Sequence, residues 1–186
     1  MRIIAGKYRG RKLKSPPSLQ TRPTSDRLRE TLFNILAPQI QDARFLDLCA
    51  GTGAVGIEAL SRGASHVTFV DQSRKMCALI EANLKTLGID KSKYEVVAVD
   101  AFEFLRKRKV GGFDVVFFDP PYSAEYERVL SFIGEHDGKL LSDNAIAVVE
   151  HAKRREVSPE FGLLRRYREL KQGDSTLSFY RVETSS

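Results

Sequence analysis

The chain has 186 residues, of which 42% are hydrophobic and 29% charged, as expected for one soluble globular domain with its own core. No apolar stretch reaches the roughly 18 residues of a membrane-spanning helix, and the N-terminus lacks the apolar segment of a secretory signal. The two cysteines form no CxxC pair and the three histidines are scattered, so we expect no metal site and a reducing, cytoplasmic compartment.

The positive charge lies mainly at the N-terminus. Residues 1–25 hold seven basic residues and no acidic one, so the other 161 residues carry a net charge of −1 in a chain that is +6 overall. With Tyr8 among the charges, this segment is typical of a phosphate-backbone contact, and the alternative is a solubilising or disordered tail. We therefore expect residues 1–23 to form an RNA-binding extension, and residues 24–186 to form the main domain. Candidate RNA contacts in the extension are Lys7, Arg9, Arg11 and Lys12.

The pattern of apolar runs predicts an α/β domain. Residues 3–13 suggest short strands or an extended arm, and a helix is expected from Ser25 to Leu36, with Pro38 beyond its end. Continuous apolar strands then alternate with helices, which indicates a Rossmann-like parallel sheet covered on both faces. The predicted strands are 45–49, 66–70, 94–99, 113–118 and 145–149, the helices are 54–62, 73–87, 101–108 and about 124–133, and residues 163–183 predict two further strands.

A glycine-rich loop follows the first predicted strand, in the order Gly51, Gly53, Gly56. Glycines at this place let the backbone turn tightly and approach a ligand at a helix N-terminus. Asp71 closes the next strand, 20 positions after Gly51, where an acidic residue bonds ribose hydroxyls in nucleotide-binding sheets. The pattern predicts a nucleoside-containing cofactor.

Four aspartates lie at or just inside the ends of successive strands: Asp47, Asp71, Asp100 and Asp119. Each alone could be a helix cap or a turn former. Together they disfavour NAD, because Asp47 lies where a pyrophosphate would bind, and they favour S-adenosylmethionine, which carries an ammonium group and no phosphate. The candidate cofactor residues are Asp47 with Ala50, Gly51 and Gly53 at the amino-acid end, Asp71 and Gln72 at the ribose, Asp100 and Ala101 at the adenine, and Asp119.

The sequence Asp119-Pro120-Pro121-Tyr122 follows the apolar run 113–118. Its carboxylate and a rigid proline carbonyl can accept hydrogen bonds from an exocyclic amino group, and the tyrosine ring can stack on a flat base. Such bonds favour the pyramidal nitrogen that forms when an aromatic amine is methylated. Asp119, Pro120 and Tyr122 are therefore the candidate catalytic residues, and the alternative is a solvated turn after a strand.

These motifs, with Arg9–Leu13, Arg22–Asn34 and Gly56–Ala64, resemble the bacterial 16S rRNA guanine-N2 methyltransferase family (the RsmD type) over nearly the whole chain. The resemblance implies a class I methyltransferase fold with a seven-stranded mixed sheet, and 16S rRNA in the small ribosomal subunit or its late precursor as substrate. It also implies that the block containing Arg22, Thr24 and Arg27 lies near the mouth of the active site, and these three residues are further candidate RNA contacts.

Other functions stay open at the level of the sequence. Asp-Pro-Pro-Tyr accepts the amine of adenine as well, so an adenine-N6 methyltransferase acting on DNA or RNA is the alternative within the same chemistry. A non-catalytic ribosome-assembly factor would use only the basic extension, and a dinucleotide dehydrogenase would use only the glycine loop. We expect a monomer, because no long apolar stripe is left over.

Overall fold

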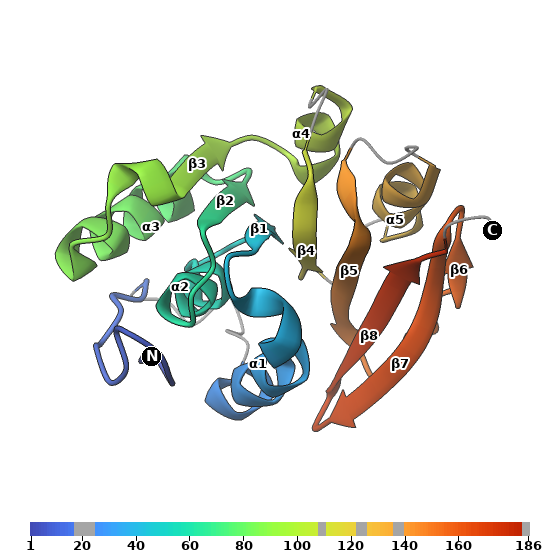
Figure 1. Cartoon of the computed structure of the whole chain (residues 1–186), viewed down its shortest axis with the longest axis horizontal. Coiled ribbons are helices and arrows are strands. Elements are labelled where there is room, and N and C mark those ends of the chain that lie inside the picture. The colour runs from blue at the N-terminus through green and yellow to red at the C-terminus, as the bar shows by residue number, and fades with distance from the viewer. Residues whose placement is uncertain (17–24, 108–110, 122–125, 136–139, 184–186) are drawn as a thin grey trace.

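A computed structural model of the chain describes residues 1–16, 25–107, 111–121, 126–135 and 140–183. They form one eight-stranded sheet in the order β3-β2-β1-β4-β5-β8-β7-β6, with helices on both faces (Figure 1). Strands β1 to β5 run parallel, whereas β8, β7 and β6 continue the sheet in antiparallel pairs. Among the described residues, no helix is long and apolar enough to span a membrane.

The predicted alternation of strands and helices is confirmed. The strands are β1 (Arg44–Leu48), β2 (His66–Asp71), β3 (Tyr94–Ala98), β4 (Phe113–Phe118), β5 (Leu141–Ala152), β6 (Glu160–Phe161), β7 (Leu164–Gln172) and β8 (Ser175–Val182). The helices are α1 (Asp26–Ile40), α2 (Ala54–Ser61), α3 (Arg74–Leu87), α4 (Ala101–Lys107) and α5 (Tyr126–Glu135), with a 3-10 turn, η1, at Lys91–Lys93.

Two details of the prediction were wrong. The sheet has eight strands rather than seven, because the two-residue β6 pairs with the start of β7, and so short a segment carries no periodic signal. Helix α1 does not end at Leu36 but continues through Pro38 to Ile40. A proline in the last turn removes only one helical hydrogen bond, and Ile40 packs into the core with 2% of its surface exposed.

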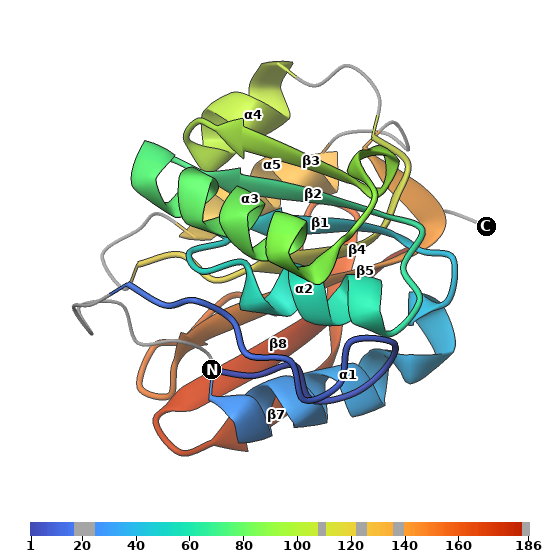
Figure 2. The ribbon, with the colours of Figure 1, turned by 90° about the vertical axis from the view of Figure 1, so that its left-hand side faces the viewer.

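The core is divided between the two faces of the sheet. Helices α1, α2 and α3 pack on one face, which carries the alternate strand residues Phe45, Phe69 and Phe117. Helices α4 and α5 pack on the other face (Figure 2). Strand order reverses between β1 and β4, since β1 leads to β2 on one side and β4 leads to β5 on the other. In open parallel sheets, this reversal opens a crevice at the carboxyl ends of the strands, where ligands bind.

Residues 1–16 form an N-terminal strap that lies against α2 and α3. Ile3 and Leu13 are buried in the core under α1 to α3. The Lys7 amide donates to the Ser61 carbonyl (2.7 Å), and the Lys14 amide donates to Asn83 Oδ1 (2.8 Å). Gly6 adopts a φ of +81°, and a Cβ there would collide with the Ser61 carbonyl. The proposed division at residue 23 stays a prediction, because residues 17–24 lie outside the described part of the chain.

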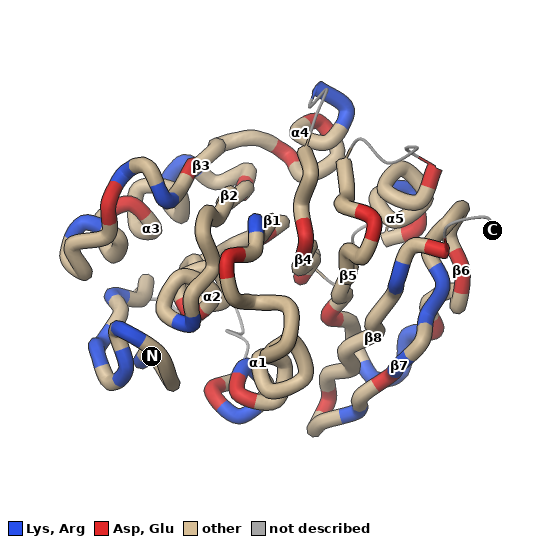
Figure 3. The backbone as a smooth tube through the Cα atoms, in the orientation of Figure 1, with Lys and Arg blue, Asp and Glu red and all other residues tan. Residues whose placement is uncertain are grey.

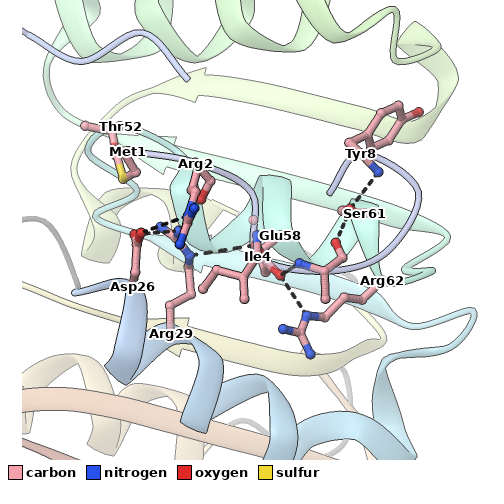
Figure 4. Close-up of polar contacts among 12 residues, drawn as sticks. Met1, Arg2, Ile4, Tyr8, Asp26, Arg29, Thr52, Glu58, Ser61 and Arg62 are labelled. Atoms are coloured by element: carbon pink, nitrogen blue, oxygen red, sulfur yellow. Dashed lines mark hydrogen bonds and ion pairs between the residues drawn. The ribbon is translucent and has the colours of Figure 1, made fainter. Parts of the chain in front are cut away.

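A buried carboxylate, Glu58 of α2, anchors the strap (Figure 4). It accepts hydrogen bonds from the backbone amides of Ile4 (2.8 Å) and Ala5 (2.9 Å) and from Arg62 Nε (2.8 Å). Arg29 of α1 is also fully buried, with its Nε 3.8 Å from Glu58, and its Nη2 donates to the Arg2 carbonyl (2.5 Å). One acid thus connects two helices and the strap.

We expect Glu58→Ala to lower the free energy of unfolding by about 3–5 kcal/mol. The change removes the acceptor of two strap amides, and it leaves the buried Arg29 paired with the exposed Asp26 (3.0 Å) instead of with a buried acid. Urea denaturation followed by circular dichroism measures the loss. Glu81→Ala is the matched control: its partner Lys91 is exposed and the change should stay within about 1 kcal/mol. Equal stabilities for the two variants would contradict the anchoring role of Glu58.

Candidate active site

The glycine loop between β1 and α2 turns sharply through left-handed backbone. Cys49, Gly51 and Gly53 all have positive φ, of 60°, 54° and 74°. The Ala50 amide donates to the Val70 carbonyl (3.0 Å), and the Gly53 amide donates to the Ala50 carbonyl (2.7 Å). The loop is therefore held against the end of β2, with α2 starting directly after it.

Asp47, at the end of β1, is hydrogen-bonded to the start of the helix that follows this loop. Its side chain is buried and its Oδ2 accepts a hydrogen bond from the Gly56 amide in the first turn of α2 (2.9 Å). Burial raises the pKa of Asp47 to about 7, the Gly56 bond lowers it, and the negative charge of Asp71 adds to the rise. The ionised form of Asp47 attracts a positive group and repels a phosphate, and a positive ligand beside it favours that form.

Asp71, at the end of β2, is half-buried and also contacts the loop. Its Oδ2 accepts from the Gly51 amide (2.8 Å) and its Oδ1 from the Ser73 amide (2.8 Å). The adjacent Gln72 is exposed. Both carboxylate oxygens are thus fixed in direction, and each keeps a further lone pair for a ligand hydroxyl.

Asp100 caps helix α4. Its exposed carboxylate accepts hydrogen bonds from the backbone amides of Phe102 (2.9 Å) and Glu103 (3.2 Å), and Ala101 beside it is buried. The Val99 amide donates to the Asp71 carbonyl (3.0 Å), so the ends of β2 and β3 are tied together. The capping role and a contact to a cofactor are compatible, because a single carboxylate oxygen, Oδ1, makes both cap bonds.

The Asp119-Pro120-Pro121 segment leaves β4 directly beside the glycine loop. The Asp119 amide donates to the Leu48 carbonyl at the end of β1 (3.3 Å). Asp119 is half-buried, Pro120 is buried and Pro121 is exposed. Burial, followed by the negative charges of Glu150 and Asp47, raises the pKa of the Asp119 carboxyl well above its usual range. Tyr122, the predicted stacking ring, lies outside the described residues.

The charges of all four predicted strand-end acids act on one group, the Cys49 thiol. Burial and the negative charges of Asp71, Asp119, Asp100 and Asp47 raise the pKa of this thiol to about 12. The structure therefore brings together the acids that the sequence placed at separate strand ends, while the role of each toward a ligand stays a prediction.

Comparison with known proteins agrees with this arrangement. A family model described as Conserved hypothetical protein 95 matches residues 1–181. Two curated relatives are named Ribosomal RNA small subunit methyltransferase D: that of Haemophilus influenzae is 40% identical over 86% of this chain and 83% of its own length, and that of Escherichia coli is 42% identical over 81% and 74%. The chain belongs to this methyltransferase family. The solved structure of yhhF from Escherichia coli superposes with a TM-score of 0.84 at 38% identity, covering 100% of this chain and 99% of that one.

This membership confirms the resemblance and the class I methyltransferase fold that it implied, with one strand more than expected. The relatives that carry this name in Haemophilus influenzae and Escherichia coli are small-subunit rRNA methyltransferases.

The basic residues expected to contact RNA lie on the outside of the strap and on α1. Lys7, Arg9, Arg11, Lys12 and Arg27 are exposed, and Figure 3 shows the strap as a concentration of positive charge. Arg11 also donates to the Thr86 carbonyl of α3 (3.2 Å). Arg22 and Thr24, the other two candidates, lie outside the described residues.

Three buried charged residues were not predicted from the sequence: Arg29, Glu58 and Glu150. Glu58 is the single acid in the otherwise apolar helix 54–60, and Glu150 directly follows the apolar run 145–149. An acid at such a position is a usable signal, because a charge within or directly after an apolar run tends to be buried with it and requires partners. Glu150 accepts a hydrogen bond from Ser175 Oγ (2.9 Å).

Asp47 should make stability depend on pH. Its folded pKa of about 7 lies above its unfolded value near 4, so the native state binds more protons between these limits and stability falls as pH rises through them. Asp47→Asn removes this term. We expect the stability of the variant relative to wild type to increase from pH 4 to pH 7 by up to roughly 4 kcal/mol.

Urea denaturation at a series of pH values measures this difference. Asp143→Asn, at an exposed position on β5, is the control and should follow the wild-type curve. A difference between Asp47→Asn and wild type that is the same at every pH would show that Asp47 titrates normally.

Proposed function

We propose that this protein transfers the methyl group of S-adenosylmethionine to the exocyclic N2 amine of one guanine in the 16S rRNA of the small ribosomal subunit. The observation that carries the proposal is the hydrogen bond from the Asp119 amide to the Leu48 carbonyl, at the point where β1 leads into the glycine loop. It holds the two proposed acceptors of the amine, the Asp119 carboxylate and the Pro120 carbonyl, beside that loop. The names of the small-subunit methyltransferase relatives support the rRNA substrate.

The residues of the crevice fit this cofactor by their chemistry. The buried Asp47 suits a ligand with an ammonium group and no phosphate, and the two fixed oxygens of Asp71 suit a pair of ribose hydroxyls. Ala50, Gly51 and Gly53 offer backbone without bulky side chains, and Gln72, Asp100 and Ala101 follow at the neighbouring strand ends. When bound, S-adenosylmethionine supplies a methyl carbon on a sulfonium, which is an electrophile.

Asp119 and the Pro120 carbonyl orient the amine. Each accepts a hydrogen bond from one of the two N–H groups of the amine, which directs the nitrogen lone pair toward the methyl carbon. The new C–N bond forms there as the C–S bond breaks. The methylated nitrogen then carries one proton too many and loses it. Asp119 can accept this proton only in its ionised form. Because its pKa is raised, Asp119 must first lose its own proton, either to the solvent or when the substrate binds. Tyr122 is the proposed stacking platform for the base.

Mapping of modified nucleosides in ribosomal RNA tests this function directly. RNA from cells with and without this gene is digested and compared by mass spectrometry. Loss of one N2-methylguanosine from the small-subunit rRNA is the expected result. Loss of an N6-methyladenosine instead would transfer the same chemistry to adenine, and unchanged nucleosides would favour an assembly factor without catalysis.

Asp119→Ala should abolish turnover, a loss of at least about 100-fold, because the developing positive charge on the amine loses its acceptor. Methyl transfer to small subunits from cells lacking the gene measures turnover, and calorimetry with S-adenosylhomocysteine measures cofactor affinity, which should change little. Asp143→Ala on β5 is the control with wild-type activity. Normal turnover of Asp119→Ala would remove this residue from the reaction.

Reversal of charge on the strap should weaken subunit binding. Arg9→Glu combined with Lys12→Glu is expected to lower the slope of log affinity against log salt by roughly one to two, since two phosphate contacts are lost. Arg106→Glu with Lys107→Glu on α4 is the control and should leave the slope unchanged. Cofactor affinity should stay the same in both variants, and a salt slope equal to wild type would place the RNA elsewhere.

A further inference from the structure

A second carboxylate, that of Glu150, lies beside Asp119. Strands β4 and β5 are parallel and pair Phe118 with Val149, so the next residues, Asp119 and Glu150, come level with each other. Phe117 and Val148 face helices α1 to α3, and side chains alternate along a strand, so the two acids also project from that face. The charge of Glu150 contributes to the raised pKa of Asp119, which agrees with close approach.

The Glu150 side chain is buried near the end of β5 and does not extend into the solvent. It is 7% exposed, and Ser175 at the start of β8 fixes the direction of its carboxylate through a 2.9 Å hydrogen bond. Asp47 and Asp71, in contrast, accept from the backbone of the glycine loop or its helix. Desolvation of a second carboxylate next to Asp119 is unfavourable, because like charges repel and each loses its hydration. A ligand with hydrogen-bond donors for both acids offsets this.

Guanine has two adjacent donors on the edge that carries its N2 amine, the N2 amino group and N1–H. Adenine differs at the equivalent place, because its N6 amine adjoins N1, which is a hydrogen-bond acceptor. With the amine held by Asp119 and the Pro120 carbonyl, the ring nitrogen beside it needs a second acceptor if it bears a proton. A carboxylate at that place accepts a hydrogen bond from N1–H of guanine. With adenine it would face the lone pair of N1, and no hydrogen bond forms.

We propose that Glu150 accepts the N1–H of the target guanine and that it determines the preference for guanine over bases whose ring nitrogen lacks a proton. This rests on the proposed function, since it assumes that the amine next to Asp119 is the N2 amine. Ser175 acts as a positioning residue that aims the Glu150 carboxylate.

The test uses 2-aminopurine, which has the same 2-amino group as guanine but an unprotonated N1. Small subunits are reconstituted with guanosine or 2-aminopurine riboside at the position located by nucleoside mapping, and kcat/KM is measured for each. The wild type should prefer guanine by roughly 10- to 100-fold, the value of a hydrogen bond to a charged group. Glu150→Gln, whose amide can also donate to N1, should lose most of this preference, because activity on guanine falls while activity on 2-aminopurine is kept or rises.

Further variants separate recognition from folding. Glu150→Ala should lose activity on guanine more than on 2-aminopurine, and Ser175→Ala should reduce the preference part of the way. Glu160→Gln, an exposed glutamate on β6, should retain the full preference. Affinity for S-adenosylhomocysteine should be equal in all of them, which shows an intact fold.

The outcomes distinguish this inference from the function on which it rests. If mapping gives N2-methylguanosine but the Glu150 variants slow both substrates by the same factor, Glu150 is structural and the inference is overturned while the function stands. If mapping gives N6-methyladenosine, the proposed function fails, and the assignment of Glu150 to N1–H fails with it.

Discussion

The parallel pairing of β1 with β4 is the constraint on which the site depends. β1 leads into the glycine loop and β4 leads into Asp119-Pro120-Pro121, so their register fixes how these two segments lie relative to each other. In the proposed function, this register sets the distance between the methyl donor and the amine. The Asp119 amide continues the ladder by one more bond, to Leu48. Because strand order reverses between these two strands, their helices go to opposite faces and leave the crevice open.

Several carboxylates lie near one another at the ends of the parallel strands, although burial and mutual repulsion disfavour their charged forms. Asp47, Asp71 and Asp100 each accept backbone amide bonds at a turn or helix start. Burial raises the pKa of both Asp47 and Asp119, and the negative charge of Glu150 adds to the rise at Asp119. In the proposed function, the three acids with amide partners contact the cofactor, whereas Asp119 and Glu150 accept hydrogen bonds from the base. This division follows strand position, since the first three acids lie at the ends of β1 to β3, Asp119 follows β4, and Glu150 lies near the end of β5.

The sequence predicted the parts of this arrangement that depend on local pattern. Continuous apolar strands, the three glycines and Asp-Pro-Pro each carry a short-range signal, and together they indicated the parallel sheet, the loop and the amine acceptors. The neighbour relation of Asp119 and Glu150 depends on the register of β4 against β5, which shifts between Phe113 and Val115, and no local pattern encodes that shift. The Glu58–Arg29 pair likewise joins residues 29 positions apart, and only the tertiary packing shows that both are buried.

The same helix that receives the glycine loop also holds the basic strap. α2 begins at Ala54, directly after the loop, and one turn later its Glu58 binds the amides of Ile4 and Ala5. Thr52, inside the loop, lies with its Oγ1 3.9 Å from Met1 Sδ. The strap charges are thereby held at a fixed distance from the glycine loop. In the proposed function, this connection lets binding of the subunit at the strap position the target base, because the strap is already ordered when the protein folds.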